Sequence, residues 1–334
     1  MNIKKRLGIY KIYKEPHMAL ESIYKVPYVR GLRVTKNLKY CLDPNLTLDL
    51  FEKRVPKIRP IFIYFHGGGF ISGDKSKREW MLKHLASNDY SVINVNYGTS
   101  INYPYPNQIQ NCALALKWVE ENAIKYSLDL NNIAIGGDGA GAFLATQLAI
   151  LNADREYAKK LDCVMSNVNI KGLVLLRGVY DLTRVALKAA TIHGKSIMKK
   201  IAPKLITALD SEDNEESIMG INEEMFKLLD LTAFVNKKFP SVYISVYDSD
   251  SFAYDTSKEF ISKLVEHKVT CWKVVGITMK NIFSKLGYDW AQKRRLILKE
   301  ANEFLLTLFN LKPKQKIHNR YIQYEVDEKE LLKY

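Results

Sequence analysis

Short, continuous apolar runs alternate with segments of helical spacing along most of the chain after residue 60. Such runs are typical of strands buried on both faces, whereas Ile109, Leu116 and Val119 recur at the spacing of one helix face. This alternation predicts a mostly parallel sheet with helices on both faces. The predicted strands cover 60–65, 91–97, 132–137, 170–178, 241–248 and 270–276, and the predicted helices 80–87, 106–127, 140–153, 255–268 and 291–309.

The chain before residue 60 has a different pattern. Residues 32–40 and 46–53 alternate between apolar and polar positions on either side of the turn-forming sequence CLDPN, which predicts a β-hairpin at the edge of the sheet. The sheet as a whole is expected within residues 33–276. Residues 180–237 carry several helical pieces without a clear strand.

Composition supports a large folded core, since 47% of the residues are hydrophobic and 11% aromatic. No run of about 18 apolar residues predicts a membrane span, and the basic N-terminus lacks the apolar stretch of a signal peptide. The four cysteines lie far apart without a C-x-x-C pair, which argues against a zinc site and fits a reducing compartment. We therefore expect a cytoplasmic protein with no metal and no cofactor.

The net charge of +14 is concentrated near the N-terminus, where residues 1–60 contain 14 basic and 5 acidic residues. A lysine-rich solvated face is the simplest interpretation, and weak association of this region with an anionic surface is the alternative. No nucleic-acid-binding motif accompanies the charge, so no specific nucleic acid is expected. The sequence does not indicate an oligomeric state.

Three segments should meet at the carboxyl ends of the parallel strands, where open α/β sheets place their sites. The first is His66-Gly67-Gly68-Gly69, whose glycines allow adjacent backbone N–H groups to face one oxygen. The second is Gly137-Asp138-Gly139-Ala140-Gly141, which has the form of a nucleophile elbow, G-x-S-x-G, with glycine in the serine position. The third is SVYDSDSFAYD (245–255). The first and third segments also have purely structural interpretations. The glycines of the first would only form a tight turn, and the aspartates of the third would only end a strand or cap a helix.

The sequences YFHGGGFISGDKS, VNYGTSINYPYPNQIQNCALALKWV, IAIGGDGAGAFLATQLAI and IKGLVLLRGVYDL resemble the hormone-sensitive-lipase-like carboxylesterase family of the α/β-hydrolase fold. The resemblance spans roughly residues 33–310 and is specific over 60–180. It implies an α/β-hydrolase domain with a mostly parallel central sheet, helices on both faces and a helical cap. The domain limits that follow are 1–32 for an N-terminal arm or cap, 33–310 for the hydrolase domain with 180–237 as its helical cap insertion, and 311–334 for a C-terminal tail.

The resemblance assigns roles to individual positions. Gly139 takes the place of the nucleophilic serine, within a motif completed by Gly137, Asp138 and Gly141. Gly67, Gly68 and Gly69, together with Ala140, would supply the N–H groups of an oxyanion hole, and His66 would be structural. Asp250 matches the acid of the triad.

Two parts of that triad are missing from the sequence. Glycine has no side chain with which to attack a carbonyl, and residues 272–290, where the histidine should follow the last strand, contain no histidine. A laboratory substitution at residue 139 would not account for the absent histidine. A register shift by one residue would make Asp138 the nucleophile, as in dehalogenase-like members of the fold, but the surrounding motif argues against it.

The predicted function is therefore a non-catalytic relative of the esterases, a pseudo-esterase that acts as a small-molecule-binding or interaction module. A small carbonyl or carboxylate compound is the expected ligand of the retained loop, by analogy with plant gibberellin receptors, which resemble these esterases, lack the histidine and bind a carboxylated hormone. The alternatives are a weak or atypical carboxylic-ester hydrolase and a basic surface protein that uses the fold as a scaffold. Asp250, without an imidazole, would pair with Lys280 or with water.

Overall fold

The computed structural model describes residues 28–99, 102–184, 223–247, 251–276, 288–311 and 320–324, with the backbone alone at several segment ends, including 288–296 and 320–324. Most of the N-terminal arm and of the 180–237 insertion lies outside the described residues. The same is true of Asp250, Lys280 and the whole of segment 277–287, so the predictions for them are not addressed by the structure.

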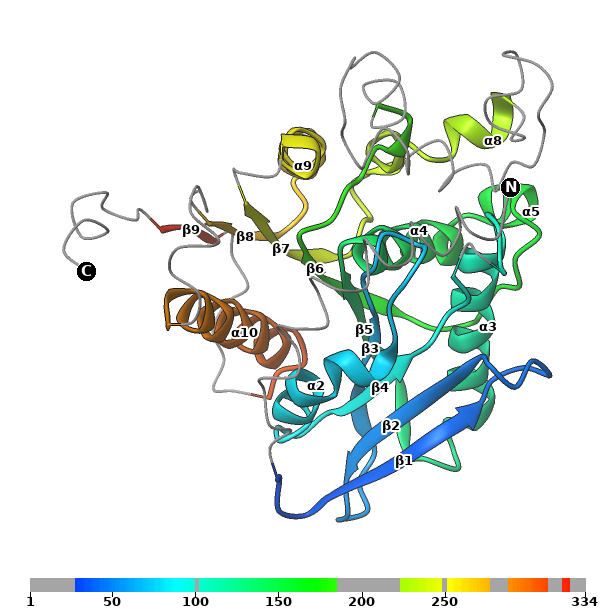
Figure 1. Cartoon of the computed structure of the whole chain (residues 1–334), viewed down its shortest axis with the longest axis vertical. Helices are drawn as coiled ribbons and strands as arrows, with labels where there is room; N and C mark the ends of the chain where they lie inside the picture. Colours follow the sequence, from blue (N-terminus) through cyan, green and yellow to red (C-terminus); the bar gives the residue numbers. More distant parts are fainter. Residues whose placement is uncertain are drawn as a thin grey trace, which may run out of the picture.

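A single sheet forms the centre of the molecule. Its strands are β1 (Leu32–Lys39), β2 (Thr47–Lys53), β3 (Arg59–Phe65), β4 (Ser91–Val95), β5 (Leu128–Asp138), β6 (Ile170–Leu176), β7 (Ser241–Tyr247), β8 (Cys271–Gly276) and β9 (Arg320–Tyr324). Their spatial order is β1-β2-β4-β3-β5-β6-β7-β8-β9 (Figure 1). β2 pairs antiparallel with β1 and β4, whereas every other neighbouring pair is parallel. The predicted edge hairpin on a mostly parallel sheet is confirmed.

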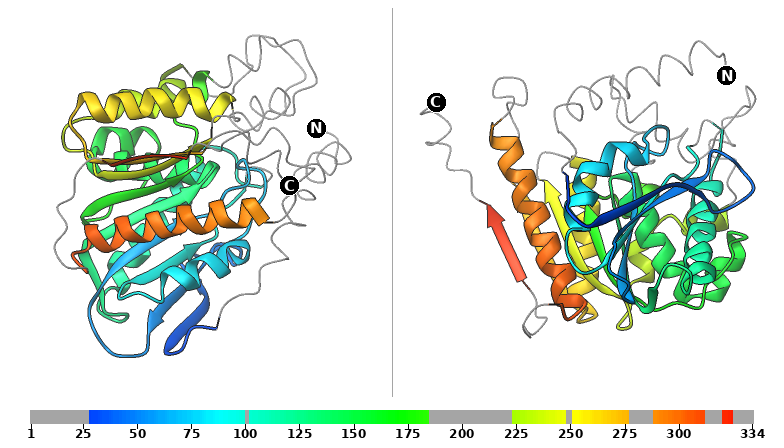
Figure 2. Two further views of the ribbon diagram at one scale, coloured as in Figure 1. Left: turned by 90° about the vertical axis from the view of Figure 1, so that its left-hand side faces the viewer. Right: turned by 90° about the horizontal axis from the view of Figure 1, so that it is seen from below.

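Helices cover both faces of this sheet, as the alternating pattern predicts. The helical elements are η1 (Lys75–Arg78), α2 (Glu79–Leu85), α3 (Asn107–Asn122), α4 (Ala140–Ala153), α5 (Arg155–Lys160), α8 (Glu223–Lys227), η3 (Leu231–Phe234), α9 (Ser251–Glu266) and α10 (Tyr288–Leu308). Helices α3, α4 and α9 lie on one face of the sheet and α2 and α10 on the other (Figure 2). Their apolar side chains form the two cores that cover these faces. No helix within the described residues is both long and apolar enough to cross a bilayer.

The two described ends of segment 180–237 run beside each other. The Leu182 amide donates to the carbonyl of Leu229 at 3.1 Å, and the Leu231 amide donates to the carbonyl of Tyr180 at 2.9 Å. These bonds flank an antiparallel bridge between Asp181 and Asp230. The two described ends of this segment therefore lie together beyond the carboxyl end of β6.

The prediction that the sheet ends at residue 276 is wrong. β9, from the predicted C-terminal tail, pairs in parallel with β8 and extends the sheet by one strand, with α10 as the crossover. Its five residues, Arg320–Tyr324, lack a regular alternation and follow a lysine-rich segment. Such a strand depends on the free edge of β8, and a local sequence pattern does not reveal a free edge.

Candidate functional site

The elbow motif forms a sharp turn from strand to helix. β5 ends at Asp138, α4 begins at Ala140, and Gly139 lies between them with φ 54° and ψ −115°. The Gly139 amide donates to the carbonyl of Leu176 at 2.9 Å, which ties the turn to β6. The predicted positive φ at Gly139 is confirmed, and this conformation is strained for any residue with a side chain.

The three glycines of the elbow are required for different reasons. A Cβ at Gly141 would overlap the carbonyl oxygen of Phe65, and a Cβ at Gly137 would lie 2.5 Å from that same oxygen. These two glycines therefore allow the elbow to pack against the end of β3. Among the described residues, a Cβ at Gly139 would meet no heavy atom within 4 Å. The described part of the chain thus leaves room for a side chain at the central position, although the sequence places none there.

The H-G-G-G loop directly follows β3 and is held by its histidine. His66 is 1% exposed, and its ring stacks on Tyr97 with 4.4 Å between the ring centroids. The Tyr97 hydroxyl donates to the backbone carbonyl of His66 at 2.7 Å, and His66 Nδ1 lies 3.0 Å from the carbonyl oxygen of Gly67. Burial lowers the pKa of His66, so its imidazole is neutral at physiological pH. This arrangement supports a structural role for His66.

The backbone of this loop also adopts conformations that need glycine. Gly68 has φ 139° and Gly69 has φ 58°. The Gly68 carbonyl accepts hydrogen bonds from the backbone amides of Ile71 and Ser72, and from the Ser72 hydroxyl at 3.0 Å. This set of bonds fixes the peptide planes that follow His66, and therefore the directions of the glycine N–H groups.

Not all of the expected oxyanion donors are available. The Gly67 amide donates to Asp138 Oδ1 at 3.0 Å, so the assignment of Gly67 as an oxyanion donor needs correction. Within the part of the chain that the structure describes, the amides of Gly68, Gly69 and Ala140 have no such acceptor. Ala140 also opens the 14-residue helix α4, whose N-terminal dipole favours a negative oxygen nearby. These three amides are the remaining candidates.

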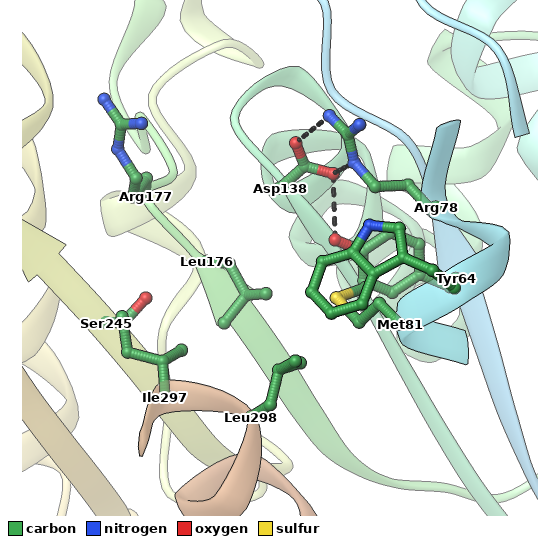
Figure 3. Close-up of a pocket in the computed structure, with 10 residues that line it drawn as sticks. Tyr64, Arg78, Met81, Asp138, Leu176, Arg177, Ser245, Ile297 and Leu298 are labelled. Carbon is green, nitrogen blue, oxygen red and sulfur yellow. Dashed lines mark hydrogen bonds and ion pairs between the residues drawn. The ribbon is translucent and has the colours of Figure 1, made fainter. Parts of the chain in front are cut away.

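Asp138 links the elbow to the H-G-G-G loop and to η1. Figure 3 shows its contacts with Arg78 and Tyr64. Its Oδ1 accepts hydrogen bonds from the Tyr64 hydroxyl at 2.8 Å and from Arg78 Nε at 3.0 Å, in addition to the Gly67 amide. Its Oδ2 accepts from Arg78 Nη2 at 2.7 Å. The carboxylate and guanidinium therefore form a two-point ion pair, with the side chains 25% and 18% exposed.

These contacts define the charge state of Asp138. Burial disfavours the ionised carboxyl, but the guanidinium of Arg78 and the hydrogen bonds from Tyr64 and Gly67 outweigh it and hold the pKa well below its usual range. The carboxylate is fully engaged, and the residue at the turn is Gly139. The geometry thus does not support the alternative in which Asp138 is a nucleophile.

A small pocket of about 110 Å³ lies beside this network, at the carboxyl ends of β5, β6 and β7. Its lining combines polar groups with an apolar wall: Tyr64, Arg78, Trp80, Met81, Asp138, Leu176, Arg177, Ser245, Ile297 and Leu298. In the view of Figure 3 the guanidinium groups of Arg78 and Arg177 lie toward one end, and Ile297 and Leu298 toward the other. Gly139 does not line this pocket.

Several of the residues that line this pocket could not be identified from the sequence. Arg78 lies in SKREW, a charged stretch that resembles an ordinary helix start, and nothing local shows that it reaches the elbow 60 residues later. Tyr64 and Ser245 occur within apolar strands, where they are indistinguishable from core residues. The useful signal was Asp138 itself, because a carboxylate at a buried strand end requires a partner.

The parallel sheet, the elbow between β5 and α4, and the loop after β3 together define an α/β-hydrolase. A family model supports this: the BD-FAE model matches residues 48–264, and the chain belongs to that family. Over 91 residues, 27% of this chain and 28% of the relative, it is 36% identical to Esterase LipI of Mycobacterium tuberculosis. Over 158 residues, 46% of this chain and 45% of the relative, it is 27% identical to a putative alpha/beta hydrolase, R526, of Acanthamoeba polyphaga mimivirus.

The fold also resembles solved esterase structures. Esterase B from Lactobacillus rhamnosis superposes with a TM-score of 0.71 and 19% identity, and the match covers 91% of this chain and 94% of that one. The predicted membership of an esterase-type α/β-hydrolase family is therefore confirmed. The chain spans less than half the length of the two curated relatives, so their activities enter only as proposals.

Proposed function

We propose that this protein is a non-catalytic α/β-hydrolase that binds a small molecule, or a partner, through its esterase-derived site. The observation that carries the proposal is Gly139, which occupies the elbow in the conformation of a nucleophile but has no side chain, although the described residues leave room for one. Acyl transfer by this architecture needs a nucleophile with a base beside it. Neither is supplied at the positions where the family resemblance expects them.

The histidines of the sequence support this proposal. Residues 272–290, expected to carry the base, contain none. His66 is buried, neutral and stacked on Tyr97. His84 belongs to α2, which packs on the opposite face of the sheet from α4, and His267 follows α9. The other three histidines, His17, His193 and His318, lie outside the described residues. A base at Gly139 would therefore have to come from an unexpected part of the chain.

The retained loop favours a ligand with a carbonyl or carboxylate oxygen. The amides of Gly68, Gly69 and Ala140 are donors without an acceptor among the described residues, and the glycine conformations of the loop keep them in place. The ion pair of Asp138 with Arg78 fixes the elbow to this loop. An oxygen bound here would accept from backbone N–H groups, as an oxyanion does in the enzymes.

A weak ester hydrolase is the second candidate. The amides of Gly68, Gly69 and Ala140, which have no acceptor among the described residues, favour it as well. An oxyanion hole without its triad accelerates hydrolysis by roughly 10³–10⁴-fold over water. That residual rate is far below what an efficient esterase achieves. The names of the relatives, esterases in two cases, agree with this ancestry.

The proposal predicts that the purified protein hydrolyses p-nitrophenyl acetate and p-nitrophenyl butyrate no faster than a heat-denatured sample. Release of p-nitrophenol, followed by its absorbance, provides the measurement. A turnover of about 1 s⁻¹ or more, ordinary for an enzyme, would overturn the non-catalytic function and favour the hydrolase.

A second prediction concerns Gly139→Ser. The Cβ of the new serine would meet no heavy atom of the described residues within 4 Å, so the variant should fold. Its esterase activity should equal that of the matched control Gly139→Ala, because residues 272–290, where the family resemblance expects the base, contain no histidine to activate the hydroxyl. Adding a histidine within residues 279–283 to the serine variant is the change expected to restore measurable activity. Strong activity of Gly139→Ser alone would reveal a base elsewhere and contradict the proposal.

A further inference from the structure

Exposed apolar side chains gather at the end of the sheet that lies opposite the candidate site. Among the described residues seven large hydrophobic side chains are exposed, and four of them belong to this end. They are Tyr28 before β1, Val55 and Ile58 between β2 and β3, and Ile124 between α3 and β5. The H-G-G-G loop and the elbow follow the carboxyl ends of β3 and β5. A partner at this surface would therefore not contact Gly139, whatever the function of the elbow.

Backbone hydrogen bonds join the three segments at this end into one surface. The Arg54 amide donates to the carbonyl of Gly31 at 2.9 Å, so the loop after β2 lies beside the residues that precede β1. The Arg59 amide donates to the carbonyl of Ser127 at 3.0 Å, so the other end of this loop lies beside the turn that follows α3. The loop between β2 and β3 thus forms the centre of the surface, at the lower end of the molecule in Figure 1.

A buried arginine holds this loop in shape. Arg59 Nη1 donates to the carbonyl oxygens of Val55 at 2.9 Å and Lys57 at 3.2 Å, and Arg59 Nε donates to the carboxylate of Asp89 at 2.9 Å. Because the backbone wraps around this guanidinium, the side chains of Val55 and Ile58 remain outside, and each is 68% exposed. A loop that is already held in one conformation loses little conformational entropy when it binds.

The charges of this surface have one sign. Segments 28–32, 53–59 and 123–128 contain no aspartate or glutamate, and their basic residues are Arg30, Lys53, Arg54, Lys57, Arg59 and Lys125. Lys57 and Arg59 pair with Asp89, and the neighbouring Glu52 pairs with Arg33. Within the described part of the chain, Arg30, Lys53 and Arg54 make no ion pair. The surface therefore presents positive charge around its exposed aliphatic side chains, and this charge attracts an anionic partner.

This combination of groups matches the interface of an anionic lipid bilayer. Aliphatic side chains such as Val55 and Ile58 can enter the boundary between headgroups and acyl chains, while lysine and arginine remain at the level of the phosphates. Nucleic acid would engage the cations but leave the two aliphatic side chains in water. A second copy of the chain in a two-fold contact would place the same positive charges face to face, which is unfavourable.

We propose that the loop between β2 and β3 binds the surface of an anionic lipid bilayer. Val55 and Ile58 enter the interface, and Arg30, Lys53 and Arg54 contact the lipid headgroups. Binding of this kind is peripheral and reversible. The candidate site, at the other end of β3, then faces away from the bilayer.

Co-sedimentation of the full chain with lipid vesicles tests the proposal. Vesicles of phosphatidylcholine with about 30% phosphatidylserine should bind about tenfold or more tightly than vesicles of phosphatidylcholine alone. Raising the salt concentration from about 0.05 M to about 0.5 M should release most of the bound protein, because salt screens the charges of the headgroups. Equal binding to neutral and anionic vesicles would overturn the proposal, as would the absence of binding to both.

Two pairs of variants show whether this loop is the part that binds. Arg54→Gln should weaken binding to the anionic vesicles by about fivefold, whereas Lys39→Gln, at the other end of β1, should leave it unchanged. Ile58→Ser should also weaken binding by about fivefold, whereas Leu42→Ser, in the turn between β1 and β2, should not. All four side chains are exposed, so the variants should fold like the wild type.

The same variants distinguish the bilayer from other partners. Equal vesicle affinity for Ile58→Ser and Leu42→Ser, or for Arg54→Gln and Lys39→Gln, would overturn the proposal, because attraction would then come from the net charge of the whole chain. Binding of a single-stranded RNA oligonucleotide that Arg54→Gln abolishes, without binding to vesicles, would identify a nucleic-acid surface instead. A dimer in solution that Ile58→Ser dissociates would assign the surface to a second copy and equally overturn it.

Discussion

Gly141→Ala is expected to lower the free energy of unfolding by about 3 kcal/mol or more. The added Cβ would overlap the carbonyl oxygen of Phe65 and lie 2.6 Å from its carbonyl carbon and 2.7 Å from the carbonyl oxygen of His66. These are backbone atoms at the end of β3, so no side-chain rotation can relieve the overlap. Helix propensity acts in the opposite direction, since alanine is favoured over glycine in a helix by about 1 kcal/mol. The clash should dominate.

Gly139→Ala is the matched control for this experiment. Its methyl group would meet no atom of the described residues within 4 Å, so its cost should be limited to the strain of a positive φ, about 1–2 kcal/mol. Urea unfolding of the two variants and the wild type gives the comparison. A Gly141→Ala variant as stable as the wild type would show that the elbow and β3 are not packed as closely as described.

The contrast between these glycines also shows what the sequence could predict. The spacing of glycines around a strand end predicts a turn, and the resemblance predicts its positive φ at Gly139, which the structure confirms. Sequence alone does not distinguish a glycine required by a neighbouring backbone from one required by its own dihedral angles. That distinction depends on where Phe65, more than 70 residues earlier in the chain, lies in space.

The core of the fold was predictable because its signals are local. Continuous apolar runs such as 60–65 and 170–178 became the central parallel strands, and the segment with Ile109, Leu116 and Val119 became α3. β9 was missed because its pairing is set by the edge of β8 and not by its own pattern. Features such as β9 could not be predicted because they depend on residues that are distant in the sequence but adjacent in space.

The same limit applies to the site. The loop of His66 and the elbow of Gly139 could be located from their motifs, and the stacking of His66 on Tyr97 agrees with a structural histidine. Gly67 was assigned incorrectly because its amide is taken by the side chain of Asp138. The hydroxyl of Ser245 and the guanidinium of Arg78 can be assigned to this pocket only once the ends of β3, β5, β6 and β7 and the helices α2 and α10 are known to lie together.

The carboxylate of Asp138 provides the second large effect. Asp138→Asn should reduce the free energy of unfolding at pH 7 by about 3 kcal/mol, because it removes the carboxylate that pairs with the guanidinium of Arg78 and places an amide N–H₂ group among the donors of Tyr64 and Gly67. The loss should also loosen the connection between the elbow and the H-G-G-G loop. Urea unfolding at a series of pH values measures this effect.

Asp89→Asn is the control for the charge itself. Asp89 also faces two cations, Lys57 and Arg59, but its side chain is 38% exposed, so this change should cost at most about 1 kcal/mol. A similar loss in both variants would mean that the cost comes from the charge and not from the partly buried geometry at the elbow.

The pH dependence follows from the lowered pKa of Asp138. The unfolded chain binds a proton at this carboxyl near its ordinary pKa of about 4, whereas the folded protein does so only at much lower pH. The stabilisation is therefore fully present above about pH 5 and is lost progressively as the pH falls below about 4. The stability difference between wild type and Asp138→Asn should shrink over that range. A difference that stays constant down to pH 3 would show that the ion pair of Asp138 with Arg78 is not what holds the elbow to its loop.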